Sequence, residues 1–499
     1  MTPEHERLLS LRRRARLSIL KRRSVAGVCV GVIVAASLAG QWTGDIPSSY
    51  WLLLTLIAAA GAAIARAEPA RTRSISLNLF AIALTVRVLW LMAATAVARH
   101  AGGPFLGPDS ASYWEGALDL ASQHLRLGVP PTAYYGSYNV GQYYLFAAVV
   151  ALFGPYLVCL QMLNAGLTAL AAPVAYAVAR LTVPRGARAI GLFIALSPSL
   201  TALAAVDLLK DPSIIFATLL ALFAILRLMR ERSARRLVVP ALVALAAFLY
   251  LRTARFYALA YIEAATCVAV ALCVLLSGRI GARRRAGLAV LALVFVAAEL
   301  IPIPAGWPTT PVVFASQVGY VMDSPGMRFY SAGFLRRFRH WKYTELDEVV
   351  EGPAGAAADV ARRLLGPFPW ILPQRWNLRT LQAGDYFLYP GMLLWYAILP
   401  FVAIGFAIGG RATFQRTGRR SIGLSVLWLF TAAYVLQYFV INLSYRQRES
   451  IVPLLLVFGW WGIVYAWQRP GLTRWYGAYW AFLTCLAIAH LSLRAMIRA

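Results

Sequence analysis

Apolar runs of a length that can cross a membrane recur along the whole chain and constrain its fold more than any other feature. A helix of about 20 apolar residues spans the hydrocarbon core of a bilayer. The chain is 60% hydrophobic and only 14% charged, whereas soluble domains carry about 25% charged residues. We therefore expect an all-α, polytopic membrane fold. The runs predict about thirteen transmembrane helices, at 24–41, 51–66, 75–98, 156–179, 187–206, 213–229, 237–251, 256–276, 286–303, 386–409, 422–441, 451–467 and 475–492.

The charged residues are strongly biased, with 48 Lys and Arg against 20 Asp and Glu. Basic residues concentrate in the short cytoplasmic loops of membrane proteins. Here the Arg-rich segments are the N-terminal tail, 66–73, 180–188, 227–236, 279–285, 411–420 and 469–474. Most carboxylates fall in the alternate segments, which are 42–50, 99–155, 207–212, 252–255, 304–385 and 442–450. The positive charge is thus explained by topology, and nucleic acid is not an expected partner.

This assignment predicts a cytoplasmic basic tail at 1–23 and a single polytopic domain at 24–499, with extracytoplasmic loops at 99–155 and 304–385. One segment within the first loop, 139–155, is apolar enough to enter the membrane. A full crossing there would invert the side of every later loop and place basic loops outside. We therefore interpret it as a juxtamembrane or re-entrant helix, with a crossing as the open alternative.

Unusual ionisable residues gather on the predicted outer side, and such residues near a membrane are candidates for function. Gly107 and Pro108 predict a turn that puts Asp109 at or next to a helix N-cap, followed by Tyr113 and Glu115. A carboxylate held there can act as a general base. The alternative is an ordinary capping aspartate.

A second acidic segment separates two apolar runs at Asp207–Pro212. Pro212 suits the first turn of the following helix, with Asp211 as its cap. Lys210 lies between the two aspartates. The alternatives are a functional cluster and a surface connector with a local ion pair.

Two pairs of arginines break the positive-inside pattern on the outer side. They are Arg252 with Arg255, and Arg446 with Arg448. Guanidinium groups match phosphate with paired hydrogen bonds, so an anionic ligand is one interpretation. Anchoring to lipid headgroups is the other. The long loop 304–385 is rich in aromatic and basic residues and is expected to form interfacial helices that capture substrate.

Several chemistries lack their motifs. The sequence contains no P-loop, no GxGxxG after a strand, no HExxH and no GxSxG in a suitable context, which argues against ATP-driven and hydride-transfer chemistry. Its five cysteines show no CxxC spacing, so neither a zinc site nor a disulfide framework is expected. No cofactor is indicated, and a divalent cation beside the carboxylates is an open alternative.

The quoted motifs resemble those of the GT-C superfamily of integral-membrane glycosyltransferases, in the bacterial branch that contains the aminoarabinose lipid A transferase and the protein O-mannosyltransferases. Pro108-Asp109-Ser110-x-x-Tyr113 is similar to a first outer-loop motif of that family. Asp211-Pro212 resembles a later outer motif, and Arg446-x-Arg448 before Pro453 resembles a third. The resemblance covers the chain from about residue 75 onward. Ser110 departs from the family's second acidic residue, which weakens a paired-carboxylate or metal site.

The resemblance implies an enzyme that transfers a sugar, with inversion, from a polyprenyl-phosphate carrier to an extracytoplasmic lipid, glycan or protein at a bacterial inner membrane. Asp109 would be the catalytic base, and Asp211 would position the acceptor or a cation. The substrate-binding candidates are Tyr113, Glu115, Lys210, Arg252, Arg255, Arg446 and Arg448.

Two other functions stay open from the sequence. One is a polysaccharide ligase or polymerase that uses a diphosphate-linked glycan. The other is a transporter of lipid-linked glycans, which would need ionisable groups near the bilayer midplane. Arg87, Glu263 and Glu299 are the few such residues in the predicted spans.

Overall fold

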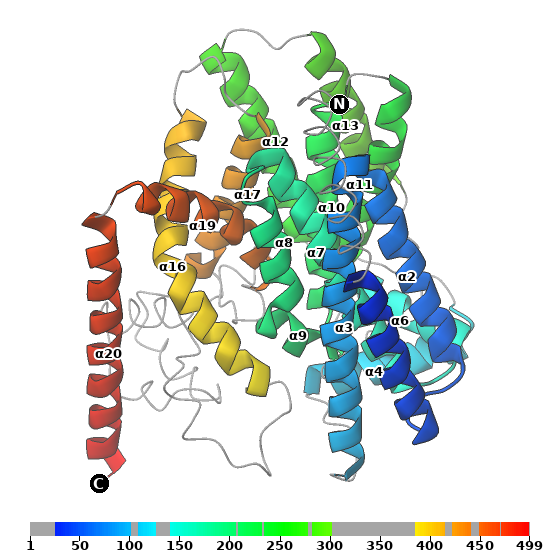
Figure 1. The fold of residues 1–499 in the computed structure, drawn as a ribbon. Helices are drawn as coiled ribbons and strands as arrows, with labels where there is room; N and C mark the ends of the chain where they lie inside the picture. The colour runs from blue at the N-terminus through cyan, green and yellow to red at the C-terminus, as the bar shows by residue number, and fades with distance from the viewer. Residues whose placement is uncertain are drawn as a thin grey trace, which may run out of the picture. The chain divides into compact units, whose positions relative to one another are not determined.

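The computed structural model describes residues 25–100, 108–125, 140–205, 208–231, 234–277, 282–301, 385–414, 422–440, 449–469 and 471–498. Every regular element in these ranges is a helix, which confirms the all-α prediction (Figure 1). In chain order they are Val25–Trp42, α2 (Ser49–Ala67), α3 (Ala70–His100), α4 (Pro108–Ser122), α6 (Val140–Phe153), α7 (Leu157–Thr182), α8 (Ala187–Leu196), α9 (Pro198–Ala205), α10 (Asp211–Leu228), α11 (Ala234–Ala254), α12 (Phe256–Ser277), α13 (Ala282–Leu300), α16 (Asp385–Phe414), α17 (Ile422–Val440), α19 (Val452–Trp467) and α20 (Gly471–Arg498).

Eight helices in the described ranges are long and apolar enough to cross a membrane. By the length and composition of these helices, the chain is a multi-pass membrane protein. They are Val25–Trp42, Ser49–Ala67, Ala70–Val97, Leu157–Thr182, Asp211–Leu228, Arg235–Ala254, Tyr257–Leu275 and Gly391–Phe414. The larger number of about thirteen spans stays a prediction.

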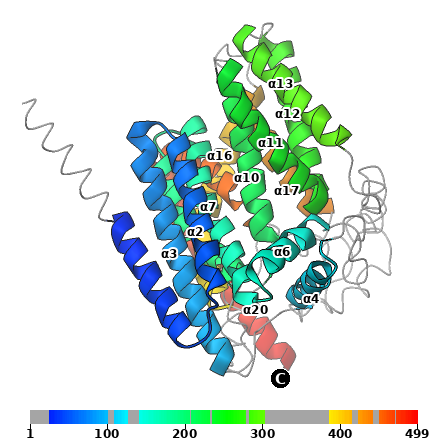
Figure 2. The same ribbon diagram turned by 90° about the vertical axis from the view of Figure 1, so that its right-hand side faces the viewer.

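Helix α6 occupies the segment whose crossing was left open. It has 14 residues, so it extends about 21 Å at 1.5 Å per residue, short of the roughly 30 Å hydrocarbon core. It ends at Phe153, and Gly154 follows with a positive φ of 89° that turns the chain. Figure 2 shows α6 inclined to the paired helices α2 and α3. This length agrees with the interpretation as a juxtamembrane or re-entrant helix.

The predicted continuous span at 187–206 was wrong, because the helix breaks at Ser197 into α8 and α9. Pro198 has no amide hydrogen to donate to the carbonyl of Ile194. From the backbone, that carbonyl receives a long hydrogen bond of 3.4 Å, donated by the Ser197 amide. The guanidinium of Arg87, on α3, donates to it at 3.1 Å and to the Ala195 carbonyl at 2.8 Å. Arg87 thereby replaces donors that the break removes.

The chain divides into two compact units. The first comprises Met1–Arg126, Ala133–Tyr135 and Gln142–Leu219, and the second comprises Leu127–Thr132, Gly136–Gly141 and Leu220–Ala499. In the first unit, α7 is the central helix and packs against α2, α3, α8 and α9. Almost all of its residues are buried. The first unit contains both candidate aspartates, Asp109 and Asp211.

Polar contacts in the first unit join segments that the sequence assigned to one side. Arg180 pairs with the buried Glu68 at 2.8 Å, which joins the ends of α7 and α2. At the other end, the Ser49 hydroxyl donates to the Phe153 carbonyl at 2.5 Å. Each contact therefore pairs two segments from the same side of the predicted topology.

In the second unit, α11, α12 and α13 lie side by side (Figure 2), and α16 packs closely on α19. Gly405 and Gly462 permit this approach, since a Cβ on Gly405 would overlap the Phe458 carbonyl and one on Gly462 the Phe401 carbonyl.

Helix α20 contacts α16 beside Pro400, a proline inside the continuous helix α16. Pro400 cannot donate to the Tyr396 carbonyl one turn earlier. The hydroxyl of Tyr479 donates to that carbonyl at 3.0 Å. The hydroxyl of Tyr476 donates to the neighbouring Ala397 carbonyl at the same distance. Tyr479 thus replaces the backbone donor that Pro400 lacks.

Candidate functional site

The first part of the candidate site is a junction of α4, α6 and α10 within the first unit. The rings of Tyr113 on α4 and Tyr143 on α6 lie 4.9 Å apart, and Phe146 adds an edge contact to Tyr113 at 6.0 Å. The Ser213 hydroxyl, near the start of α10, donates to the Gln142 side chain on α6 at 2.8 Å. Neighbouring residues of α6 therefore contact the second turn of α4 and the first turn of α10. We call this arrangement the α4–α6–α10 junction.

Asp109 is the second residue of α4, which begins at Pro108. Its backbone lies one turn before Tyr113, while its side chain lies outside the described part of the structure. Tyr113 is buried, whereas Glu115 is exposed. The predicted placement of Asp109 at the start of a helix is confirmed.

Pro212 lies in the first turn of α10, as predicted. Asp211 is the first residue of that helix rather than the cap before it. It is buried, and Lys210 is half-buried. The Ile214 amide donates to the Lys210 carbonyl at 3.1 Å and closes the first turn of the helix. Asp207, the other acidic residue of this segment, lies outside the described residues.

The positions of the two aspartates have a common electrostatic property. The exposed amide groups and dipole at a helix N-terminus favour a negative charge in the first turn. Asp109 and Asp211 each occupy such a turn. An ionised carboxylate can accept a proton or bind an N–H or O–H donor of a substrate.

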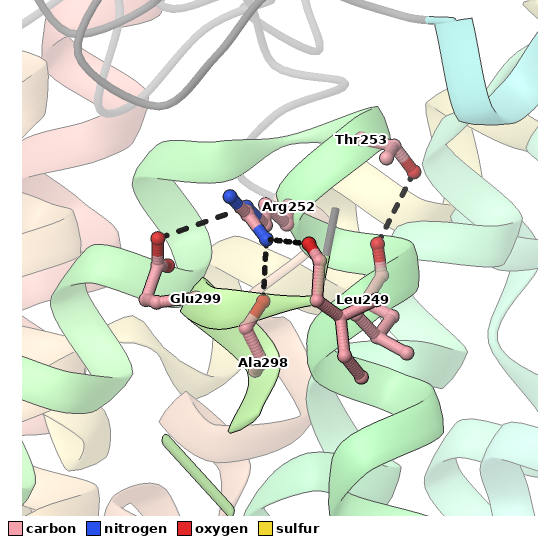
Figure 3. Close-up of polar contacts among 6 residues, drawn as sticks. Leu249, Arg252, Thr253, Ala298 and Glu299 are labelled. Carbon is pink, nitrogen blue, oxygen red and sulfur yellow. Dashed lines mark hydrogen bonds and ion pairs between the residues drawn. The ribbon is translucent and has the colours of Figure 1, made fainter. Parts of the chain in front are cut away.

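Arg252 lies in the last turn of α11 and binds the end of α13 (Figure 3). One terminal nitrogen donates to the carbonyls of Ala298 at 2.5 Å and Ile301 at 3.1 Å. Its Nε lies 3.7 Å from the carboxylate of Glu299. Free carbonyls at a helix C-terminus attract a cation. These contacts give Arg252 a structural partner in the second unit.

Arg255 lies between α11 and α12 and is buried. One terminal nitrogen donates to the hydroxyls of Tyr434 and Ser450, each at 3.2 Å. Its guanidinium carbon also lies 5.5 Å from the ring centre of Tyr257, a cation–π distance. Arg255 thus has hydroxyl and aromatic partners within the second unit.

The remaining candidates are only partly described. Arg446 and Arg448 lie outside the described residues, as does most of the predicted capture loop 304–385. The next residues in the chain, Glu449 and Ser450, are buried. Among the described residues, no group of three or more His, Cys, Asp or Glu side chains is arranged to hold a metal ion.

The structure adds polar residues that the sequence interpretation missed. They are Gln142 and Ser213 at the α4–α6–α10 junction, together with Asn164 and Thr168 on α7, and all four are buried. The Asn164 amide donates to the Leu209 carbonyl at 3.1 Å, directly before Lys210. A polar side chain inside an apolar run is the signal that identifies such residues.

Comparison with known proteins gives two structural neighbours. No protein-family model and no curated protein matches the chain. The crystal structure of the Archaeoglobus fulgidus oligosaccharyltransferase in its apo form is 14% identical, with a TM-score of 0.48. The archaeal oligosaccharyltransferase AglB from Archaeoglobus fulgidus, in complex with an inhibitory peptide and a dolichol-phosphate, is 15% identical with the same TM-score. Each match covers 83% of this chain but only 54% of the other, so this chain spans about half the length of either neighbour. At such low sequence identity and TM-score, no residue role and no activity is inferred for this chain from either neighbour.

Proposed function

We propose that this chain is an integral-membrane glycosyltransferase of the GT-C superfamily that transfers a sugar from a polyprenyl-phosphate carrier to an extracytoplasmic acceptor. The observation that carries the proposal is the α4–α6–α10 junction, in which α6 contacts Tyr113, one turn after Asp109 on α4, and Ser213 in the first turn of α10. The motifs shared with GT-C enzymes contain these same two aspartates. A pair of carboxylates at helix N-termini suits a transfer reaction in which one carboxylate deprotonates the acceptor and the other orients it toward the anomeric carbon of the donor.

The proposed chemistry is a single displacement with inversion. Asp109 accepts the proton of an acceptor group, and the freed electron pair forms a new bond to the anomeric carbon. The bond between that carbon and the phosphate oxygen breaks, and polyprenyl phosphate leaves with the electron pair. Asp211 is proposed to orient the acceptor. Because the sugar is already activated on lipid phosphate, this reaction needs no nucleotide.

The leaving phosphate needs positive charge during the transfer. We propose that Lys210, Arg446 and Arg448 bind it directly. Arg252 and Arg255 are proposed to add positive charge, since part of their hydrogen-bonding capacity is used within the second unit. Tyr113 and Glu115 are proposed to contact the substrate beside Asp109.

The proposed reaction takes place at the outer face of a bacterial inner membrane, with the N-terminus in the cytoplasm. The basic loops support this orientation by the positive-inside rule. The polyprenyl tail stays among the membrane lipids, and the acceptor is a lipid, glycan or protein of the cell envelope.

A donor assay tests the proposed function. The purified full chain is reconstituted in phospholipid vesicles with a cell-envelope extract and radiolabelled polyprenyl-phosphate monosaccharides, each sugar supplied separately. We expect at least one sugar to be transferred, with release of an equal amount of polyprenyl phosphate. Transfer only from a diphosphate-linked glycan would replace the proposal with the ligase or polymerase alternative. Movement of the lipid-linked sugar across the bilayer without transfer would favour the transporter.

A further inference from the structure

A row of buried polar side chains runs through the interior of the first unit. Arg87 on α3 and Asn164 and Thr168 on α7 are each 0% exposed. All three lie in helices that are long and apolar enough to cross the membrane. Buried polar groups in such a setting are costly unless they are hydrogen-bonded. Their contacts therefore indicate what each of them holds in place.

The three residues are connected through one side-chain contact and the backbone of α7. Nε of Arg87 donates to the Thr168 hydroxyl at 2.9 Å. That hydroxyl lies 3.1 Å from the backbone carbonyls of both Asn164 and Ala165, one turn earlier in α7, to which it donates. The Asn164 side-chain amide donates to the Leu209 carbonyl at 3.1 Å. We call these three residues the polar ladder.

The two ends of the polar ladder hold the same stretch of chain at two points. Arg87 binds the carbonyls of Ile194 and Ala195, where α8 ends. Asn164 binds Leu209, where the stretch reaches Lys210 and Asp211. The short helix α9 lies between these two points.

The structure assigns a positioning role to the polar ladder: we infer that Asn164, supported by Thr168 and Arg87, fixes the backbone that presents Lys210 and Asp211. The inference rests on the proposed function, in which Asp211 orients the acceptor. The Leu209 carbonyl is one peptide unit before Lys210, so loss of the Asn164 donor frees the backbone at that point. Displacement of a catalytic group by about 1 Å lowers a rate up to roughly a hundredfold.

The first test is hydrogen exchange of the purified full chain, which needs no substrate. Asn164→Asp keeps the shape of the side chain but removes the amide donor to Leu209. We expect faster exchange in the peptide covering Leu208–Ile214, with no change in peptides from α16 and α19. Unchanged exchange in the Leu208–Ile214 peptide would overturn the inference, whether or not the chain transfers sugar.

The second test is kinetic and uses the donor identified for the wild-type protein. Asn164→Asp is expected to lower kcat by about tenfold to a hundredfold, with a smaller rise in KM for the donor, because Lys210 is one of three proposed phosphate ligands and the other two are not held by this backbone. Thr168→Val is expected to act in the same direction, and Thr168→Ser, which retains a hydroxyl, is expected to restore kcat.

Thr266→Val is the matched control. Its hydroxyl is buried on α12 and donates only within its own helix, to Ile262 at 2.7 Å, so kcat should stay at the wild-type value. Faster exchange without loss of kcat in Asn164→Asp would contradict the positioning role. An equal loss of kcat in Thr266→Val would also contradict it.

If Asn164→Asp does not fold, the test becomes the comparison of Thr168→Val with Thr168→Ser. Equal kcat in these two variants would then contradict the positioning role. Absence of sugar transfer by the wild-type chain would instead count against the proposed function. The role of the polar ladder would then be tested by hydrogen exchange, which needs no substrate.

Discussion

Replacing Asp109 with Asn is expected to lower the rate of sugar transfer by at least about a hundredfold. General base catalysis contributes about 10²–10⁴-fold to a rate. The amide of Asn has nearly the same size as the carboxylate but cannot accept the acceptor's proton. Asp109 lies in the first turn of α4, where an uncharged Asn is also a favourable residue, so the helix should persist. The measurement is kcat with the radiolabelled donor in reconstituted vesicles.

Asp119→Asn is the control for this variant. Asp119 lies on the same helix and accepts hydrogen bonds from Gln123 at 3.1 Å. The same chemical change there should leave kcat within about twofold, since surface substitutions away from special features have small effects. Wild-type kcat in a folded Asp109→Asn protein would remove Asp109 as the base.

Replacing Arg87 with Met is expected to produce the largest loss of stability in the first unit. The change removes the donors to the Ile194 and Ala195 carbonyls. Pro198 cannot supply the hydrogen bond that Ile194 lacks, and the site is fully buried. A buried acceptor left without a partner costs about 1–3 kcal/mol. We therefore expect the free energy of unfolding to fall by about 3 kcal/mol, measured by denaturant titration in detergent micelles.

Thr95→Ala on the same helix provides the comparison for Arg87→Met. The Thr95 hydroxyl donates to the Leu91 carbonyl one turn earlier, at 2.8 Å. That carbonyl keeps its helical backbone partner when the hydroxyl is removed, so the expected loss is below about 1 kcal/mol. If Arg87→Met is as stable as the wild type, the carbonyls at the end of α8 do not depend on Arg87.

Helix beginnings and long apolar runs were predictable because they depend on local properties. Proline fits the first turn of a helix, where no amide donor is needed. This rule located the start of α10, where Pro212 follows Asp211. The turn expected at Gly107 and Pro108 placed a helix start beside Asp109, and α4 begins at Pro108. The run predicted at 51–66 corresponds to α2 at Ser49–Ala67, since length and hydropathy alone define such a helix.

The break at Ser197 was not predictable from its own run. Its apolar residues continue through Pro198, and proline occurs inside other helices of the chain, such as α7 at Pro173. What distinguishes Pro198 is Arg87, a side chain 107 residues away from Ile194 that satisfies the freed carbonyl. Partners this distant in the sequence become neighbours only through tertiary packing.

The candidate site was also predictable only in part. Asp109, Asp211 and Arg255 attract attention as ionisable residues beside apolar runs. Asn164 and Gln142 do not, because uncharged polar residues inside such runs are common and their partners are unknown from sequence. The structure links Asn164 to Leu209 and Gln142 to Ser213. It also shows that Arg252, in the predicted outer segment 252–255, binds the end of α13, which falls in the predicted span 286–303.

The most direct test of the central claim is a structure of the full chain in a lipid nanodisc with a bound polyprenyl-phosphate sugar. We predict that the phosphate contacts Arg446 or Arg448 at the outer membrane face, with Asp109 directed toward the anomeric carbon. A head group bound at the cytoplasmic face, beside the Arg-rich loops and away from Asp109, would contradict the account.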